Sequence, residues 1–364
     1  MQIMFRNFLL ITLFLFLGTC VFPQSGRVKK KIEKDAKKPK KKRTYVLTQK
    51  VTKKSLPKIS VTPTPTPKKS DDDVIKVNSA FVPIPVSVIE NGSGKAITNL
   101  RMKDFELKID NALVEIGDLF KSESPVKLAL LFDNSSSVTI AREFEQRAAI
   151  RFFKRVIRPD KDQAALYSIA GISRLEQGMT KDVQSLVRAI KSFVKPQGAT
   201  ALHDGIIKAS NYLQDYSGRR VIVIVSDGQD TLSDSTFDEM VKTVQENNCQ
   251  VYIVHTNEFE NFKRTGNRGG SANIRALAAE RRMRTLADQT GGAVYSPIDK
   301  RELDIAFRQI SAELSQQYIL AYYPKNEARD GRFRAIDLRV KSKTDITLRA
   351  RKGYYVKRKI IRDK

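Results

Sequence analysis

From residue 126 onward, short apolar runs alternate with longer segments in which apolar residues recur at helical spacing. The runs "KLALLFD", "QAALYSI", "RVIVIVS" and "CQVYIVH" predict buried strands. Between and after them, residues 140–157, 182–194, 201–216 and 299–316 predict amphipathic helices. Strands that alternate with helices indicate a parallel sheet that is covered on both faces. The predicted fold class is therefore α/β, with a Rossmann-like, open and mostly parallel sheet.

The composition of single runs also predicts their places in the sheet. "RVIVIVSDG" is the most hydrophobic run, so we expect a central strand there, buried on both faces. "GGAVYSP" predicts a short edge strand, and "SRLEQGMT" predicts a strand joined tightly to the one before it. A long basic segment with several glycines, residues 259–284, precedes the last strand. It is either a mobile loop or a selectivity element near a binding site.

The segments on both sides of the α/β pattern have a strand-like character. Residues 74–123 contain short strands and turns, and Pro83 and Pro85 predict an edge strand or a bulge because proline cannot donate a ladder hydrogen bond. Residues 317–357 contain further strands. A small β unit needs more strands to bury a core, so these two segments are predicted to pair into one β-sandwich-like unit. The α/β domain would then be an insertion in it.

These patterns divide the chain into six predicted segments. They are a signal peptide (1–25), a disordered basic Lys-, Pro- and Thr-rich linker (26–70), an N-terminal β unit (71–124), the α/β domain (125–316), C-terminal strands (317–357) and a basic tail (358–364).

The first residues predict export. Arg6 precedes a compact apolar core at residues 8–17, which is typical of a secretory signal and short for a bilayer span. We therefore expect a periplasmic, envelope-associated or secreted protein. Basic residues follow the core closely, so an N-terminal membrane anchor is an alternative, and Cys20 raises lipid attachment as another. After cleavage near Ser25 only Cys249 would remain, so the fold would rely on packing or metal instead of an intramolecular disulfide.

Positive charge is concentrated in one segment. Residues 27–69 carry seventeen Lys or Arg and two acidic residues, which is +15 of the formal net charge of +26. "KKKIEKDAKKPKKKR" repels itself and "VTPTPTPKK" favours extended polyproline geometry, so the segment is predicted to be a tether. The alternative is a basic tail that contacts anionic envelope polymer or lipid headgroups. We expect no nucleic-acid partner, because no zinc-finger spacing appears and Tyr45 is the one aromatic residue in the basic tract.

Oxygen-bearing side chains gather where apolar strands end. Asp133 ends the first strand and is followed by Ser135 and Ser137, Asp227 follows "RVIVIVS", and Thr200 lies in a loop just before a helix. Ligands of open parallel sheets lie beyond the carboxyl ends of the strands. Two carboxylates and three hydroxyls make an all-oxygen site, so we expect Mg²⁺ or Mn²⁺ rather than Ca²⁺. An outside carboxylate could take a vacant position on the ion.

These motifs resemble those of von Willebrand factor type A domains. "DNSSS" fits the family's Asp-x-Ser-x-Ser motif, "GATAL" fits the loop with the metal-site threonine, and "VIVIVSDGQD" fits the strand that ends in Asp-Gly. The order and spacing match over residues 126–314, and the flanking segments resemble those of secreted bacterial proteins of this family. The resemblance implies a metal-ion-dependent adhesion site made of Asp133, Ser135, Ser137, Thr200 and Asp227.

The same resemblance implies a function. It predicts a metal-dependent adhesion or interaction module, not an enzyme, in which a Mg²⁺-type ion accepts a Glu or Asp carboxylate from a partner protein. It also implies that a shift of the final helix, residues 299–316, changes the metal shell and the affinity.

Three alternatives remain open. A hydrolase could use Asp133 or a metal-bound water at this edge, although residue 135 is Ser instead of a second carboxylate. We expect neither His203 nor His255 to have a partner that would make it a catalytic base. An envelope spacer with a non-functional metal site would show no ligand dependence on metal. Ser135 and Ser137 could also simply cap the following helix.

Overall fold

A computed structural model describes most of the chain beyond residue 80. The described residues are 81–121, 124–136, 142–196, 198–268, 274–324, 330–341 and 345–356. They all belong to the second of two compact units, Met1–Asp73 and Val74–Lys364. The predicted signal peptide, linker and basic tail lie outside the described residues, as does Ser137. Within these ranges, no helix has the length and hydropathy needed to span a bilayer.

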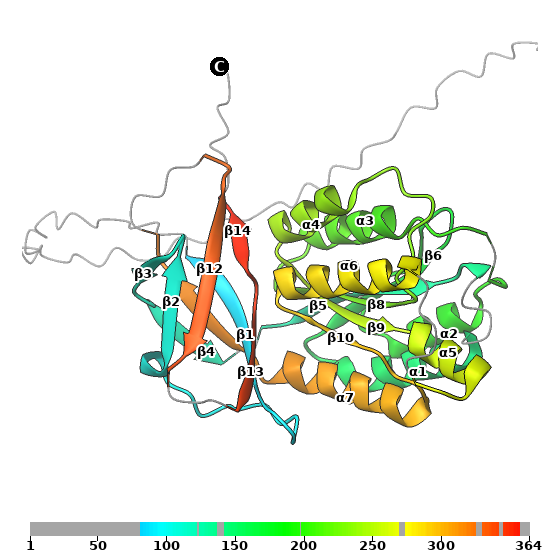
Figure 1. The fold of residues 1–364 in the computed structure, drawn as a ribbon, viewed down its shortest axis with the longest axis horizontal. Helices are drawn as coiled ribbons and strands as arrows, with labels where there is room; N and C mark the ends of the chain where they lie inside the picture. The colour runs from blue at the N-terminus through cyan, green and yellow to red at the C-terminus, as the bar shows by residue number, and fades with distance from the viewer. Residues whose placement is uncertain are drawn as a thin grey trace, which may run out of the picture. The chain divides into compact units, whose positions relative to one another are not determined.

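The α/β domain is built on one sheet. Its strands are β5 (Val126–Asp133), β6 (Gln163–Ile169), β7 (Arg174–Thr180), β8 (Arg219–Ser226), β9 (Cys249–His255) and β10 (Ala293–Tyr295). In the described part of the chain they form a six-stranded sheet in the order β10-β9-β8-β5-β6-β7 (Figure 1). Neighbours are parallel except β6 and β7, which are antiparallel. The predicted central strand, short edge strand and tightly joined pair are confirmed.

Helices cover both faces of this sheet (Figure 1). On one face lie α1 (Arg142–Val156), α2 (Val183–Lys191), α5 (Asn257–Thr265) and α7 (Lys300–Ser315), and on the other lie α3 (Leu202–Gln214), α4 (Phe237–Glu246) and α6 (Ile274–Thr290). Successive strand residues point to opposite faces. Leu130 of β5 therefore packs with α1 and α7, and Leu131 packs with α3, α4 and α6. The predicted α/β fold class is confirmed.

The basic segment 259–284 is not simply a loop, so that interpretation is wrong. Its described part continues α5 to Thr265 and enters α6 at Ile274. Gly266 ends α5 with a φ of 74°, a conformation that glycine adopts without strain. In α6, buried side chains recur at helical spacing at Ala279, Met283 and Leu286, and this apolar stripe explains why a charged segment is helical.

The flanking segments form two four-stranded sheets in the described part of the chain. One has the order β13-β1-β11-β4 and the other β14-β12-β2-β3. The strands are β1 (Val82–Glu90), β2 (Phe105–Ile109), β3 (Ala112–Val114), β4 (Asp118–Lys121), β11 (Tyr318–Tyr322), β12 (Phe333–Val340), β13 (Ile346–Ala350) and β14 (Gly353–Tyr355), with a short 3-10 helix at Met102–Asp104. Val86, Leu107, Leu320 and Ile336 belong to one apolar core between the sheets. This is the predicted sandwich-like unit.

Strand β1 as a whole lies inside its sheet, but the part that contains Pro83 and Pro85 has one unpaired edge, as predicted for that part. Val82–Val86 pair with β11, and Val86–Glu90 pair with β13. Pro83 and Pro85 therefore lie in the half of β1 that pairs on one side only. The carbonyl of Pro83 accepts a hydrogen bond of 2.6 Å from Arg351 Nη2, which shows that this edge of β1 faces away from β11. The missing proline N–H groups thus remove no ladder hydrogen bond.

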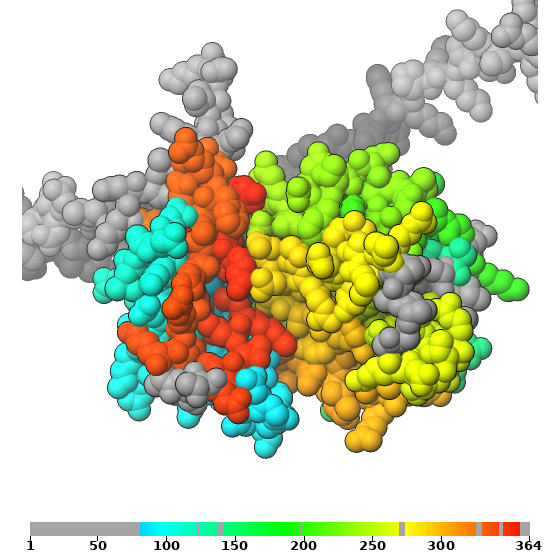
Figure 2. Space-filling model, in the orientation of Figure 1, coloured from blue at the N-terminus to red at the C-terminus, as the bar shows by residue number. Residues whose placement is uncertain are grey.

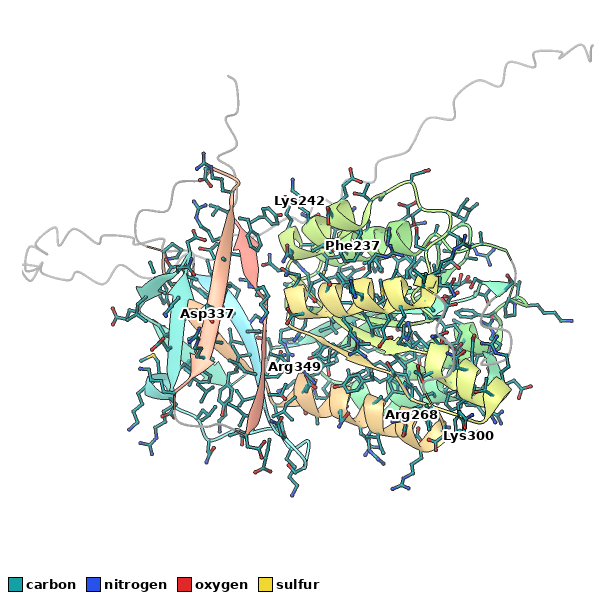
Figure 3. All side chains as sticks on the ribbon, in the orientation of Figure 1. Phe237, Lys242, Arg268, Lys300, Asp337 and Arg349 are labelled. Atoms are coloured by element: carbon teal, nitrogen blue, oxygen red, sulfur yellow. The ribbon has the colours of Figure 1, made fainter. Side chains whose placement is uncertain are left out.

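The α/β domain lies between β4 and β11 in sequence, and the sandwich packs against it. β4 pairs with β11 in register, with Lys121 opposite Tyr318. Strand β14 and helix α4 lie side by side, with Lys242 Nζ 5.7 Å from the ring centroid of Tyr355 (Figure 1, Figure 2). Arg349 of β13 extends to the end of α7 (Figure 3).

Candidate functional site

Asp133 and Asp227 lie at neighbouring strand ends. β5 pairs with β8 in parallel, with Phe132 opposite Val225. Asp133 is therefore beside Ser226, whose Oγ donates a hydrogen bond of 2.6 Å to Asp133 Oδ2. The exposed fractions are 1% for Asp133 and 2% for Asp227. The structure thus brings both predicted carboxylates to the same buried edge of the sheet.

The environment of Asp133 favours its protonated form. Its pKa is raised to about 6, mainly because burial disfavours the charged carboxylate and secondly because the charge of Asp227 is close. Hydrogen bonds from Ser226 and Ser135 lower the pKa and offset part of this effect. Among the described residues, neither carboxylate forms an ion pair with a lysine, arginine or histidine.

The two residues directly after Asp133 are buried. The backbone N–H of Asn134 donates to Ile169 O at 2.7 Å, which fixes the loop to the end of β6. The backbone N–H of Ser135 donates to Asp133 Oδ1 at 2.9 Å, and the Ser135 side chain is 2% exposed. Ser135 therefore lies at the predicted site. Ser137 lies outside the described residues, so its role stays a prediction from the motif.

Thr200 lies in a loop that contacts both neighbouring loops. Ser136 donates to Gly198 O from its backbone N–H at 3.3 Å and from Oγ at 3.0 Å. On the other side, the backbone N–H groups of Thr231 and Leu232 donate to Thr200 O at 2.9 Å and 3.1 Å. Thr200 is 4% exposed. Hydrogen bonds thus hold the three predicted loops together.

The turn after β8 explains why Gly228 follows Asp227. Gln229 donates to Asp227 Oδ1 from its backbone N–H and to Oδ2 from Nε2, both at 3.0 Å, so the carboxylate is held while each oxygen keeps a free lone pair. Gly228 has a φ of 76°, and a Cβ there would lie 2.9 Å from Met283 Cγ and 3.3 Å from His255. Only glycine fits this turn without displacing its neighbours.

Two further carboxylates lie near the site and were not predicted. Glu145 in α1 is fully buried, and its pKa is raised well above the usual value, first by burial and then by the charges of Asp133 and Glu260. The pKa of Glu260 in α5 is raised to about 8, first by burial and then by Asp227 and Asp133. The sequence held one signal: Glu145 precedes Ala148 by three residues on the apolar stripe of its helix, where a charge is unusual.

The side chains at this edge fit a hard divalent cation. Asp133, Ser135, Thr200 and Asp227 offer oxygen ligands only, which Mg²⁺ prefers. The pKa of Asp133 is raised first by burial and then by the charge of Asp227, and a bound cation would offset both effects by favouring the charged carboxylate. Within the described ranges, no three His, Cys, Asp or Glu side chains converge as metal ligands. Hydroxyls and waters would therefore have to complete the coordination.

The two histidines differ in their partners. His203 Nδ1 lies 3.2 Å from Ser235 O and 3.7 Å from Asp230 Oδ2, and the second distance is too long for a hydrogen bond. Asp230 is there because its Oδ1 accepts hydrogen bonds from the N–H groups of Leu202 and His203 at the start of α3. His255 is 1% exposed, and burial lowers its pKa, so it is neutral at pH 7.

Comparison with known families agrees with this geometry. Residues 128–229 match the family model of the von Willebrand factor type A domain, and this range contains all the predicted site residues. The chain is therefore a protein with a von Willebrand factor type A domain. No curated protein sequence matches it significantly.

Solved structures show weaker similarity. The PilB minor pilin from Streptococcus sanguinis is 12% identical, with 54% of this chain and 62% of that chain covered and a TM-score of 0.40. The conserved hypothetical protein BatB from Bacteroides thetaiotaomicron is 17% identical, with 52% of this chain and 100% of that chain covered and a TM-score of 0.41. The pilus adhesin SpaC from Lactobacillus rhamnosus GG is 9% identical, with 59% of this chain and 34% of that chain covered and a TM-score of 0.42. At these values the similarities carry no argument about function.

Proposed function

We propose that this chain is an exported, non-enzymatic protein-binding module that acts through a divalent cation. The metal ligands would be Asp133, Ser135, Ser137, Thr200 and Asp227, and the ion would be Mg²⁺ or Mn²⁺. One observation carries the proposal: two buried carboxylates lie together with buried hydroxyls at the carboxyl edge of the sheet. Groups of like charge are kept so close when a proton or a cation compensates them.

The surrounding residues hold this arrangement before any ion binds. Ser226 Oγ and the Ser135 N–H each bond one oxygen of Asp133, and Gln229 bonds both oxygens of Asp227. Side chains fixed in this way lose little freedom on metal binding. When bound, the ion supplies a positive centre with room for an outside oxygen ligand. The ligand we propose is a Glu or Asp side chain of a partner protein.

The thermal midpoint of the full chain tests the metal site. We expect the chain, stripped with EDTA, to gain a saturable rise in midpoint with Mg²⁺ or Mn²⁺, because a ligand that binds only the native state stabilises it. Asp133→Ala should lose the response. Asp337→Ala is the matched control, because Asp337 is a partly exposed aspartate on the sandwich (Figure 3). Equal responses of Asp133→Ala and Asp337→Ala would refute the site and favour a structural spacer.

Peptides test the carboxylate ligand. An array of Glu- and Asp-containing peptides, each with its Gln or Asn counterpart, is probed with the full chain in Mg²⁺ and in EDTA. We expect binding to acidic members only, and only with metal. Binding that survives both EDTA and Glu→Gln replacement would contradict the proposal.

Export rests on the apolar core at residues 8–17 and has its own test. Fractionation of cells that express the full chain should place it in the envelope or the medium, with an amino terminus near residue 26. A cytoplasmic chain with an intact amino terminus would overturn this part of the proposal. Recovery in the membrane fraction with residues 1–25 retained would indicate an anchor.

A further inference from the structure

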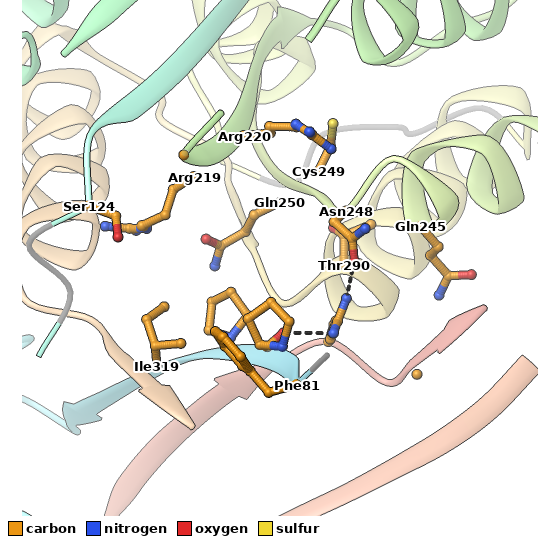
Figure 4. Close-up of a pocket in the computed structure, with 15 residues that line it drawn as sticks. Phe81, Ser124, Arg219, Arg220, Gln245, Asn248, Cys249, Gln250, Thr290 and Ile319 are labelled. Carbon is orange, nitrogen blue, oxygen red and sulfur yellow. Dashed lines mark hydrogen bonds between the residues drawn. The ribbon is translucent and has the colours of Figure 1, made fainter. Parts of the chain in front are cut away.

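A cavity lies at the end of the sheet opposite to the predicted metal ligands. Its volume is about 260 Å³, and residues of the sandwich and of the starts of β8 and β9 line it. Asp133 and Asp227 lie at the opposite, carboxyl ends of the strands. Figure 4 shows Phe81, Arg219 and Gln250 around this space. The proposed metal site does not use these residues.

Two buried arginines line the cavity. Arg219 and Arg351 are each 8% exposed. Arg219 donates hydrogen bonds to Leu314 O and Gln317 Oε1. Arg351 donates to Pro83 O and to the side-chain oxygen of Asn248, a bond drawn in Figure 4. All four acceptors are neutral oxygens, so these bonds supply no negative charge to either arginine.

A third arginine adds to this charge. Arg220 is partly buried and donates to three backbone carbonyls, those of Tyr216, Asn247 and Gln214. Among the described residues, no carboxylate lies within ion-pair distance of any of the three guanidinium groups. Burial lowers the pKa values of Arg219 and Arg351 to about 10, so both stay charged at neutral pH. Uncompensated buried charge is costly, and an anion would offset that cost.

Part of the cavity lining is apolar. It consists of Phe81, Pro83, Pro85 and Ile319, and Phe81 is 44% exposed. The volume is below the roughly 300–1,000 Å³ of pockets for drug-sized ligands. A small molecule with an apolar body and one charged group would match this combination of apolar and cationic residues. The guanidinium group is planar and pairs well with carboxylate and phosphate oxygens.

We propose that this cavity binds a small organic anion, a carboxylate or phosphate attached to an apolar body. The charged group would contact Arg351 and Arg220, and the body would pack against Phe81 and the two prolines. Because residues of both the sandwich and the α/β domain line the cavity, a bound anion would stabilise the contact between them. The site is independent of the proposed metal site, so either can fail without the other.

Calorimetric titration of the full chain tests the anion. All titrations are made in EDTA, so that no carboxylate binds through a metal. The probes are benzoate, phenyl phosphate, inorganic phosphate, and benzamide as the neutral counterpart of benzoate. We expect saturable binding of benzoate and phenyl phosphate, weaker binding of inorganic phosphate, and none of benzamide. Equal binding of benzoate and benzamide, or no binding of any anion at about 10 mM, would overturn the proposal.

Variants locate the binding. Arg351→Gln and Arg220→Gln should each weaken benzoate binding by about tenfold or more. Arg339→Gln is the control, because Arg339 is an exposed arginine on the sandwich that pairs with Asp337. Arg220 is less buried than Arg351, so its variant keeps the test valid if Arg351→Gln does not fold. Unchanged benzoate affinity in Arg220→Gln would overturn the assignment to this cavity.

Discussion

At the scale of single residues, the carboxyl edge of the central sheet concentrates negative charge. The pKa values of Asp133, Glu145 and Glu260 are raised, first by burial and then by the charges of neighbouring carboxylates, which include Asp227. Such a cluster opposes folding when it is fully ionised and without a cation. The same carboxylates therefore affect both metal binding and the stability of the metal-free protein, and substitutions should separate these two effects.

Replacing Asp133 with asparagine should stabilise the metal-free protein. Asp133→Asn removes a buried charge whose pKa is about 6, roughly two units above the usual value, which corresponds to about 1–3 kcal/mol at pH 7.5. The same variant should lose the response to Mg²⁺. Urea unfolding in EDTA and in Mg²⁺ measures both effects. A metal-free variant that is less stable than the parent would contradict this prediction.

The stability of the metal-free protein should also depend on pH with a defined sign. The folded-state pKa values of Asp133 (about 6) and Glu260 (about 8) lie above their ordinary values. The folded state therefore binds more protons than the unfolded state between about pH 4 and 8, and stability falls as pH rises through that window. Metal affinity should change in the opposite direction, weakening below about pH 6 as protons compete for Asp133. Urea unfolding and metal titration from pH 5 to about 8 test this, with Asp133→Asn as the control.

The sequence was sufficient for some site residues and not for others. Asp133, Thr200 and Asp227 could be predicted because apolar strands and a helix start define their places before any contact is known. Glu145 and Glu260 could not, because a glutamate on a helix usually faces solvent, and only the packing of α1 and α5 buries these two.

At the scale of elements, the end of helix α7 is held by a buried cluster. Glu313 is 4% exposed, accepts hydrogen bonds from Tyr252 and Tyr295 at 3.2 Å and 2.7 Å, and pairs with Arg349 of β13. Arg219 of β8 also donates to the carbonyl of Leu314. Any displacement of α7 must therefore break contacts with β13 of the sandwich as well as with the central sheet.

Breaking this cluster should be costly. Arg349→Met leaves the Glu313 carboxylate buried without its cation, which typically costs about 3 kcal/mol or more. The matched control is Arg339→Met, which removes a partly exposed pair with Asp337 worth less than about 1 kcal/mol. Chemical denaturation gives both values. Similar losses for the two variants would show that the Glu313 pair contributes no more than a surface pair.

The edge strand β10 depends on a glycine. A Cβ at Gly292 would lie 1.8 Å from Val251 O, so Gly292→Ala should displace β10 from β9 and cost about 3 kcal/mol or more. Gly178→Ala in β7 is the control, since the nearest atom there, Tyr212 Oη, lies at 3.6 Å, an ordinary contact. Thermal unfolding compares the two. An unchanged midpoint in Gly292→Ala would contradict the close approach.

Element type could be predicted from the sequence better than element environment. Periodicity identified the strands and helices of the α/β domain, but Pro83 and Pro85 suggested an edge strand because sequence does not show where β13 begins to pair. Likewise the charge and glycines of residues 259–284 outweighed the apolar stripe of α6. In both cases the missing information was the position of a distant partner.

At the scale of the whole molecule, charge is divided between a strongly basic segment and a mildly basic body. Residues 27–69 hold +15 of the total +26. If this segment contacts anionic surfaces, the full chain should co-sediment with vesicles that contain phosphatidylglycerol and not with neutral phosphatidylcholine vesicles. Binding should weaken between about 50 and 500 mM salt because screening shortens the range of the attraction. A chain without residues 27–69 that binds equally well would refute this assignment.

The position of the α/β domain inside the sandwich has a consequence for folding order. Strands β1 to β4 are synthesised first, but β1 and β4 pair with β11, which follows nearly two hundred residues later. Until then, the early strands expose unpaired edges that other chains can join. The intervening domain forms mostly from its own consecutive segments, so it can fold first and bring β11 to β4. The sandwich is thus the high-contact-order part of the protein, and its closure is the step we expect to limit the folding rate.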